Sequence, residues 1–183
     1  MNLQFTKKIS LLLLLSTLCY LHLSAQQVIF YEDFNTYNGP GGNGEDWGKG
    51  RAKEKADLDP TKWESHEYLY QGFKCLRLGS VTHPSASIIT KNLNYQGPCI
   101  LSLRAGLWKS KPLKKLQIKI MRTDKDSLIE VEFKQAGLFY YYQLYIPNMT
   151  EDTRFAFINK GSAQNIFLLD DIKIITGIPT SFT

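Results

Sequence analysis

Along most of the chain, hydrophobic and polar residues alternate with a period of two, which is the pattern of β-strands that bury one face. In the clearest case four apolar residues share one face of a strand: Leu101, Leu103, Ala105 and Leu107. Ser102 and Arg104 fall on the opposite face. No window longer than about ten residues has the spacing of an amphipathic helix. The pattern therefore predicts an all-β fold.

Segments with this strand pattern are separated by turn-forming residues. They are 28–34, 73–78, 87–90, 99–107, 116–122, 128–133, 140–146, 154–159 and 165–175. Residues 35–69 are rich in Gly, Asp and Lys, and we expect them to be irregular. Short strands with a turn every ~8–12 residues are typical of an antiparallel two-sheet β-sandwich, and we expect a jelly roll.

The first 25 residues have the features of a secretory signal peptide. Lys7 and Lys8 precede an apolar stretch, Ile9 to Leu23, and a small residue follows at the cleavage position, Ala25. The stretch is shorter than the roughly 20 residues that a membrane-spanning helix needs. A lipid anchor on the cysteine of this stretch is the alternative. We expect a secreted or periplasmic protein, or one at the cell surface.

Export changes the composition only slightly. Cleavage leaves 183 − 25 = 158 residues, and the formal charge falls from +5 to +3 because Lys7 and Lys8 are removed. A weakly basic, exported chain is not expected to bind nucleic acid. We expect one β-sandwich domain at 26–176, a tail at 177–183, and no transmembrane segment after cleavage.

Two carboxylates fall among apolar residues near the ends of the domain. Strict alternation places Glu32 on the same face as Phe30, and Asp170 on the same face as Leu168 and Ile172. A carboxylate buried among apolar groups must be paired, protonated or bound to a metal. The alternative is that both acids lie at strand ends, accept backbone N–H bonds and remain hydrated.

Calcium fits the first interpretation because it binds carboxylate and carbonyl oxygens. The glycine-rich loop after the first strand can offer oxygens near Gly42 and Asn43, beside Glu32 and Asp170. We therefore predict a structural Ca²⁺ held by these four residues, whose removal lowers the melting temperature. Four further aspartates could complete the shell: Asp33, Asp57, Asp59 and Asp171.

Several short motifs occur in the order found in one group of exported domains. They are Glu32-Asp33-Phe34, Gly41-Gly42-Asn43, Trp63, Cys75 to Gly79, Leu101 to Trp108, and Phe167 to Ile174. In this order the chain resembles galactose-binding-like jelly-roll modules secreted by Bacteroidetes-type bacteria, which are related to carbohydrate-binding modules and adhesin-type envelope domains. The resemblance implies a structural calcium between Glu32 and Asp170.

Aromatic side chains in or beside the loops of such a module can stack on sugar rings. The candidates are Trp47, Trp63, Tyr68, Tyr70 and Trp108. The alternative is that these rings fill the core or cap its ends. The run from Phe139 to Tyr142 must place tyrosines on both faces of its strand, so at least one points away from the core.

The two remaining cysteines lie in a compartment that permits disulfides. Alternation places Cys75 on the outer face of its strand and Cys99 on the inner face of its own, which argues against a bond between them. A bulge in either strand could still allow one.

Motifs for catalysis are weak. The segment from Phe133 to Gln143 is similar to a catalytic strand of alginate-lyase jelly rolls, but their Gln-Ile-His strand reads Gln117-Ile118-Lys119 here. We therefore expect a noncatalytic module that binds carbohydrate at the cell envelope. The alternatives are a structural or adhesive envelope protein that binds another protein and, third, a polysaccharide lyase.

Overall fold

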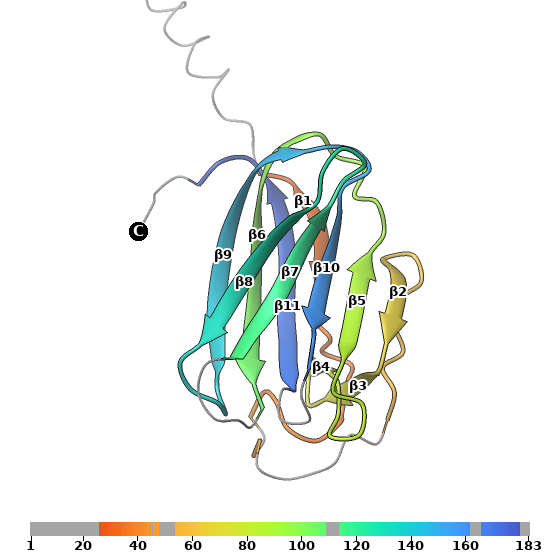
Figure 1. Ribbon diagram of the computed structural model, residues 1–183, viewed down its shortest axis with the longest axis vertical. Coiled ribbons are helices and arrows are strands. Elements are labelled where there is room, and N and C mark those ends of the chain that lie inside the picture. The colour runs from red at the N-terminus through yellow and green to blue at the C-terminus, as the bar shows by residue number, and fades with distance from the viewer. Residues whose placement is uncertain (1–25, 45, 48–53, 109–113, 162–165, 180–183) are drawn as a thin grey trace, which may run out of the picture.

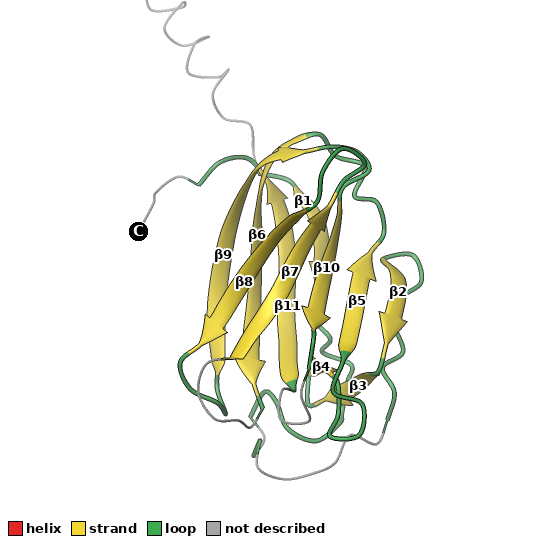
Figure 2. Ribbon diagram, viewed as in Figure 1, coloured by secondary structure: helices red, strands yellow, loops and turns green. Residues whose placement is uncertain are grey.

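The computed structural model describes residues 26–44, 46–47, 54–108, 114–161 and 166–179. Across these residues the chain forms eleven β-strands and no helix (Figures 1 and 2). The strands are β1 (Val28–Glu32), β2 (Trp63–Glu67), β3 (Leu69–Gly72), β4 (Cys75–Leu78), β5 (Ala86–Thr90), β6 (Gly97–Leu107), β7 (Lys114–Met121), β8 (Ser127–Phe133), β9 (Phe139–Met149), β10 (Arg154–Asn159) and β11 (Phe167–Thr176).

The strands form two antiparallel sheets that pack face to face (Figure 1). The six-stranded sheet has the order β3-β4-β11-β6-β9, and β1 pairs with β11. The five-stranded sheet has the order β2-β5-β10-β7-β8. Apart from the β3–β4 and β7–β8 pairs, strands that are consecutive in sequence lie in different sheets, as in a jelly roll. The predicted antiparallel β-sandwich is confirmed.

The core lies between the two sheets. On β6, Leu101, Leu103 and Ala105 are fully buried, as their alternation predicts. Side chains of β7 and β10 meet them from the other sheet, and they are also buried: Leu116, Ile118, Phe155 and Phe157. The burial of these apolar faces is the main force that holds the two sheets together.

Strands β2 and β3 were not expected, because they lie within or next to the segment predicted to be irregular. Their sequences, WESHE and LYQG, have little apolar alternation. They form strands instead because β2 pairs with β5 and β3 pairs with β4. Tyr68, which separates β2 from β3, has a φ of 50°, and this turn carries the chain from one sheet to the other.

The last strand contains a β-bulge, so it does not alternate strictly. Its pairing with β6 shifts between Asp170 and Lys173, and Asp171 has a φ of 47°. Both aspartates therefore point to the outward face of the sheet, where they meet Arg104, while Ile172 returns to the core. The prediction that Asp170 shares the core face with Ile172 is wrong, because alternation alone does not reveal a bulge.

A second apolar cluster lies on the outward face of the six-stranded sheet. It consists of Trp47, Cys75, Trp108, Ile166 and Leu168, with Phe139 packed against it. Two glycines allow the rings to approach closely, because a Cβ on Gly41 would lie 2.2 Å from Trp108 Cζ3 and one on Gly106 would lie 2.4 Å from Trp47 Cη2. The glycine-rich loop is thus folded onto the sheet.

Cys75 and Cys99 are free and buried, in agreement with the alternation argument. Cys75 belongs to the outward cluster and Cys99 to the core between the sheets. Burial raises the pKa of each thiol to about 12.

We therefore expect Cys75 and Cys99 to resist thiol reagents in the folded protein, because both are shielded and neutral at pH 7. Denaturation without reductant should expose both to titration with a chromogenic disulfide. If the denatured, unreduced protein left either thiol unreactive, the assignment of free cysteines would be contradicted.

Candidate functional site

The tryptophans expected to bind ligand are packed inside the protein. Trp63 is 3% exposed and makes an edge-on contact with Phe30, at 5.1 Å between ring centroids. Trp47 and Trp108 are 9% and 4% exposed in the outward apolar cluster. Tyr70 on β3 is half-buried. The three indoles lack an exposed ring face, since each loop folds its large apolar side chain onto nearby apolar surface.

Three of the four residues predicted to bind metal lie close together, and Glu32 has different partners. Asn43 Nδ2 donates to Asp170 Oδ2 over 2.6 Å. The carbonyl of Gly42 accepts from Trp47 Nε1 over 2.8 Å. The Glu32 carboxylate accepts instead from Lys62 Nζ and Trp63 Nε1, each over 3.3 Å.

These groups do not form an oxygen cage that fits calcium. Arg104 Nη1 donates to Asp170 Oδ2 over 3.0 Å, and Arg104 Nη2 donates to Asn43 Oδ1 over 2.8 Å. A guanidinium therefore already occupies the cationic position beside the carboxylate, and N–H donors engage the oxygens. Within the part of the chain that the structure describes, no three His, Cys, Asp or Glu residues are grouped to hold a metal.

This arrangement argues against the four-residue calcium site predicted from the sequence, and thermal unfolding with and without a chelator tests that prediction. A melting temperature that falls with EDTA and recovers with added Ca²⁺ would confirm a structural ion. An unchanged melting curve, with no metal found by elemental analysis, would contradict it. Mg²⁺ added back at the same ionic strength is the control for a salt effect.

The bulge in β11 builds a polar network on the outward face. Arg104 bridges the two aspartates, since its Nη1 also donates to Asp171 Oδ2 over 3.3 Å. Asp171 Oδ1 accepts from the Tyr31 hydroxyl over 3.4 Å. Burial and the charge of Asp171 raise the pKa of Tyr31. Burial also raises the pKa of Asp170, although Asn43 and Arg104 lower it.

Beside this network, polar and aromatic residues form a row across four strands. Cross-strand partners place Tyr31 of β1 next to Lys173, Lys173 next to Ser102, and Ser102 next to Gln143 of β9. Neighbouring strands are about 4.8 Å apart, so the row spans roughly 14 Å. Tyr141 and Tyr145 flank Gln143 on the same face of β9. We call these six residues the tyrosine face.

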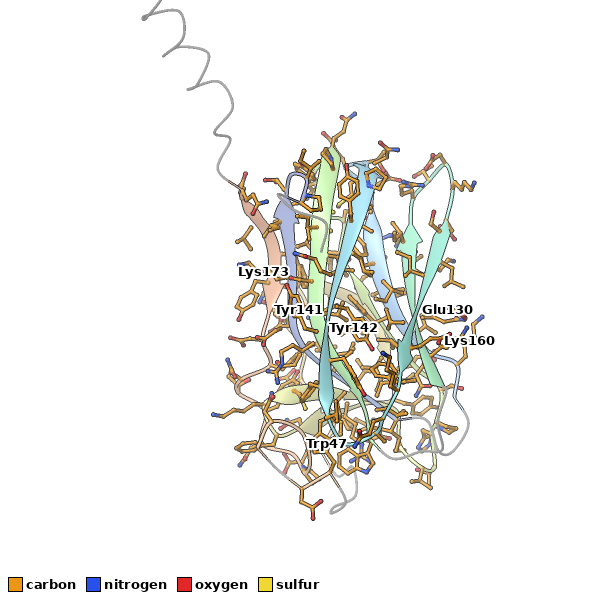
Figure 3. All side chains as sticks on the ribbon, turned by 90° about the vertical axis from the view of Figure 1, so that its left-hand side faces the viewer. Trp47, Glu130, Tyr141, Tyr142, Lys160 and Lys173 are labelled. Atoms are coloured by element: carbon orange, nitrogen blue, oxygen red, sulfur yellow. The ribbon has the colours of Figure 1, made fainter. Side chains whose placement is uncertain are left out.

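Three tyrosines of this face are open to solvent: Tyr141 is 65% exposed, Tyr31 44% and Tyr145 39%. Tyr31 and Tyr141 line a shallow depression of about 370 Å³, together with Val28, Ser102, Asp171 and Lys173. Figure 3 places Tyr141 and Lys173 together on the outward side of the six-stranded sheet. Aromatic surface, an ammonium group and a carboxylate thus converge on one place.

The outward face of the other sheet has a different character. Its charged side chains pair with one another, as Lys115 does with Glu130 and Glu132 over 3.1 and 2.9 Å. Lys119 pairs with Asp126 over 2.6 Å. In Figure 3, Glu130 lies on the opposite side of the molecule from Tyr141. Solvated, paired charges therefore take the place that exposed tyrosine rings have on the six-stranded sheet.

Sequence reasoning identified the tyrosine face only in part. The expectation that one tyrosine of the run at 139–142 points away from the core is confirmed by Tyr141. Tyr142 is half-buried and donates from its hydroxyl to the Glu132 carbonyl over 2.7 Å. Tyr31 and Lys173 were not expected, although alternation around Phe30 and Ile174 would have placed both outward.

No protein-family model and no curated protein sequence matches the chain significantly. Among solved structures, it is similar to a module named BiXyn10A CBM1, with 13% identity, a TM-score of 0.48, and coverage of 82% of this chain and 99% of that one. The CBM22-1 xylan-binding domain of Paenibacillus barcinonensis Xyn10C is 12% identical, with a TM-score of 0.48 and coverage of 82% and 94%. TmCBM61 in complex with β-1,4-galactotriose is 10% identical, with a TM-score of 0.45 and coverage of 69% and 98%. Such distant likeness does not identify a ligand for this chain.

One further finding concerns membranes. Among the described residues, no helix has the length and hydropathy needed to cross a bilayer.

Proposed function

We propose that the protein is a noncatalytic module that binds carbohydrate on the tyrosine face. The observation that carries this proposal is the exposure of Tyr31 and Tyr141 on the lining of one depression, with Tyr145 exposed on the same face of β9. Large aromatic rings exposed together are unusual on a soluble surface, and such patches mark binding sites.

The chemistry of the face suits a sugar. A pyranose presents apolar C–H groups on its ring faces and hydroxyls around its edge. A tyrosine ring offers an apolar platform with a polar tip, so it can contact both. Lys173 can donate hydrogen bonds to hydroxyls, Asp171 can accept them, and Gln143 can do either. A mainly apolar surface with a few convergent polar groups is the usual composition of a small-molecule site.

The face is also held rigidly before any ligand arrives. All of its residues lie on paired strands. Tyr31 is linked to Asp171, and Asp171 to Arg104, which is joined to the loop through Asn43. A ligand therefore meets a backbone that is already ordered and a Tyr31 side chain that is held by Asp171, which reduces the entropy lost on binding.

We further propose that the chain is exported and acts at the cell envelope. This part rests on the first 25 residues, whose apolar stretch lies outside the described residues. It predicts a mature N-terminus at Gln26, which N-terminal sequencing of protein recovered from the envelope or the medium would check.

Affinity electrophoresis in gels that contain soluble polysaccharides tests the binding proposal. The panel should include xylans, mannans, galactans, β-glucans and uronate polymers. We expect at least one to retard the protein and not an unrelated protein of similar size. If no polymer or oligosaccharide of a broad array binds, the proposal is contradicted.

A further inference from the structure

The six-stranded sheet ends at an unusually open edge strand. β9 pairs with β6 and with no other strand among the described residues. It is 11 residues long, with the sequence FYYYQLYIPNM, and it contains no charged residue. Soluble proteins normally protect a long edge strand with charges, proline or a bulge, because its free N–H and C=O groups can pair with another chain.

The other edge strands of the two sheets are protected. β8 presents Glu130 and Glu132 to solvent. β1, β2 and β3, which each pair with one other strand in the described part of the chain, are only 5, 5 and 4 residues long. In β9, Pro147 interrupts the edge only near its C-terminal end, so the eight residues from Phe139 to Ile146 remain available. These β9 residues lie at the edge of the sheet that is at the left of Figure 1 and faces the viewer in Figure 3.

The side-chain pattern of β9 is compatible with a second copy of itself. Tyr141, Gln143 and Tyr145 point outward, while Tyr140, Tyr142 and Leu144 point between the sheets. In an antiparallel pair with a dyad at Gln143, the two Gln143 amides lie opposite each other. Tyr141 then lies opposite the partner's Tyr145, so outward residues meet outward residues and no like charges are brought together.

We propose that β9 pairs with β9 of a second copy and forms a C2 dimer in which the two six-stranded sheets become continuous. This is an isologous contact, so it closes after two copies. It places both tyrosine faces on the same side of one sheet and leaves both depressions open. The two sites could then engage one polymer together, and the avidity would exceed that of either site.

The inference rests on β9 alone and holds whether or not the tyrosine face binds carbohydrate. Sedimentation equilibrium of the purified protein over a range of concentrations tests it. We expect a reversible monomer–dimer equilibrium. Gln143→Lys places two like charges opposite each other at the dyad and should raise the dimer dissociation constant about fivefold or more. Val81→Lys adds the same charge at a site 66% exposed and remote from β9, and it should leave the constant unchanged.

A disulfide test fixes the register. Gln143→Cys should form an intermolecular disulfide under mild oxidation, because cross-strand partners at a dyad bring their Cβ atoms within bonding range. Cys75 and Cys99 are buried and should not react. A protein that stays monomeric at all concentrations, or a dimer that responds equally to the lysine substitutions at 143 and 81, overturns the inference.

Discussion

Tyr141→Ala is expected to remove most of the carbohydrate affinity without lowering the melting temperature. The side chain is 65% exposed on β9, so its loss leaves no cavity in the core. At the centre of a binding surface, truncation of an aromatic anchor commonly costs about 2 kcal/mol, which corresponds to about thirtyfold in affinity. Isothermal titration calorimetry with the best ligand of the panel measures this change.

Tyr68→Ala is the matched control. Tyr68 is 49% exposed, and its ring stacks on His83, away from the tyrosine face. The Tyr68→Ala variant therefore loses a comparably exposed ring from a different part of the surface. We expect its affinity to match that of the unmodified protein. If Tyr68→Ala abolished binding and Tyr141→Ala did not, the ligand would have to bind elsewhere.

The second large effect concerns the network behind the face. Arg104→Ala should lower the free energy of unfolding by about 3 kcal/mol at pH 7, because it leaves the buried Asp170 carboxylate without its countercharge. The side chain of Asp170 is only 4% exposed, whereas that of Arg104 is 36% exposed. Asp170→Asn should therefore cost much less, since the Arg104 guanidinium that remains can be hydrated. Chemical denaturation of the two variants measures both values.

The destabilisation caused by Arg104→Ala should depend on pH in a direction that follows from the pKa of Asp170. Burial raises the pKa of Asp170 in the folded protein, so the folded state binds this proton more tightly than the unfolded state does. The contribution of Asp170 to stability therefore falls as the pH rises between the unfolded and the folded pKa. Loss of Arg104 raises that pKa further. The destabilisation caused by Arg104→Ala should thus be largest near neutral pH and shrink as acid protonates Asp170.

In Asp170→Asn, which has no carboxyl to titrate at this position, the pH dependence from this residue should be lost. Equal effects of Arg104→Ala at acidic and neutral pH would contradict the role given to Asp170. Equal destabilisation by the two substitutions would contradict it as well, because the argument depends on the difference in burial between the two partners.

Much of the fold could be predicted because local alternation and burial agree. Leu101, Leu103 and Ala105 lie on the predicted inner face of β6, and Arg104 lies on the predicted outer face. Strands β2 and β3 could not be predicted, since their sequences carry little apolar periodicity and pairing alone defines them. Local pattern is informative only where one face of a strand is buried by the core.

The candidate site was harder to predict because it depends on tertiary contacts. The bulge at Asp170 and Asp171 reverses the face that alternation assigns to Asp170. Trp47 and Trp108 lie near loops in sequence, but the glycine-rich loop packs onto the sheet and buries both rings in the outward apolar cluster. Which outward strand face stays open depends on where that loop lies, and the tyrosine face is the part that it leaves uncovered.

The central claim is that ligand binds on the outward face of β1, β11, β6 and β9. Backbone amide chemical shifts, recorded by NMR during titration with the bound oligosaccharide, test this most directly. We expect the largest changes at Tyr31, Ser102, Tyr141 and Lys173, with little change on β7 and β8. Changes concentrated around Tyr68 and Tyr70, or on the charged face of β7 and β8, would contradict the claim.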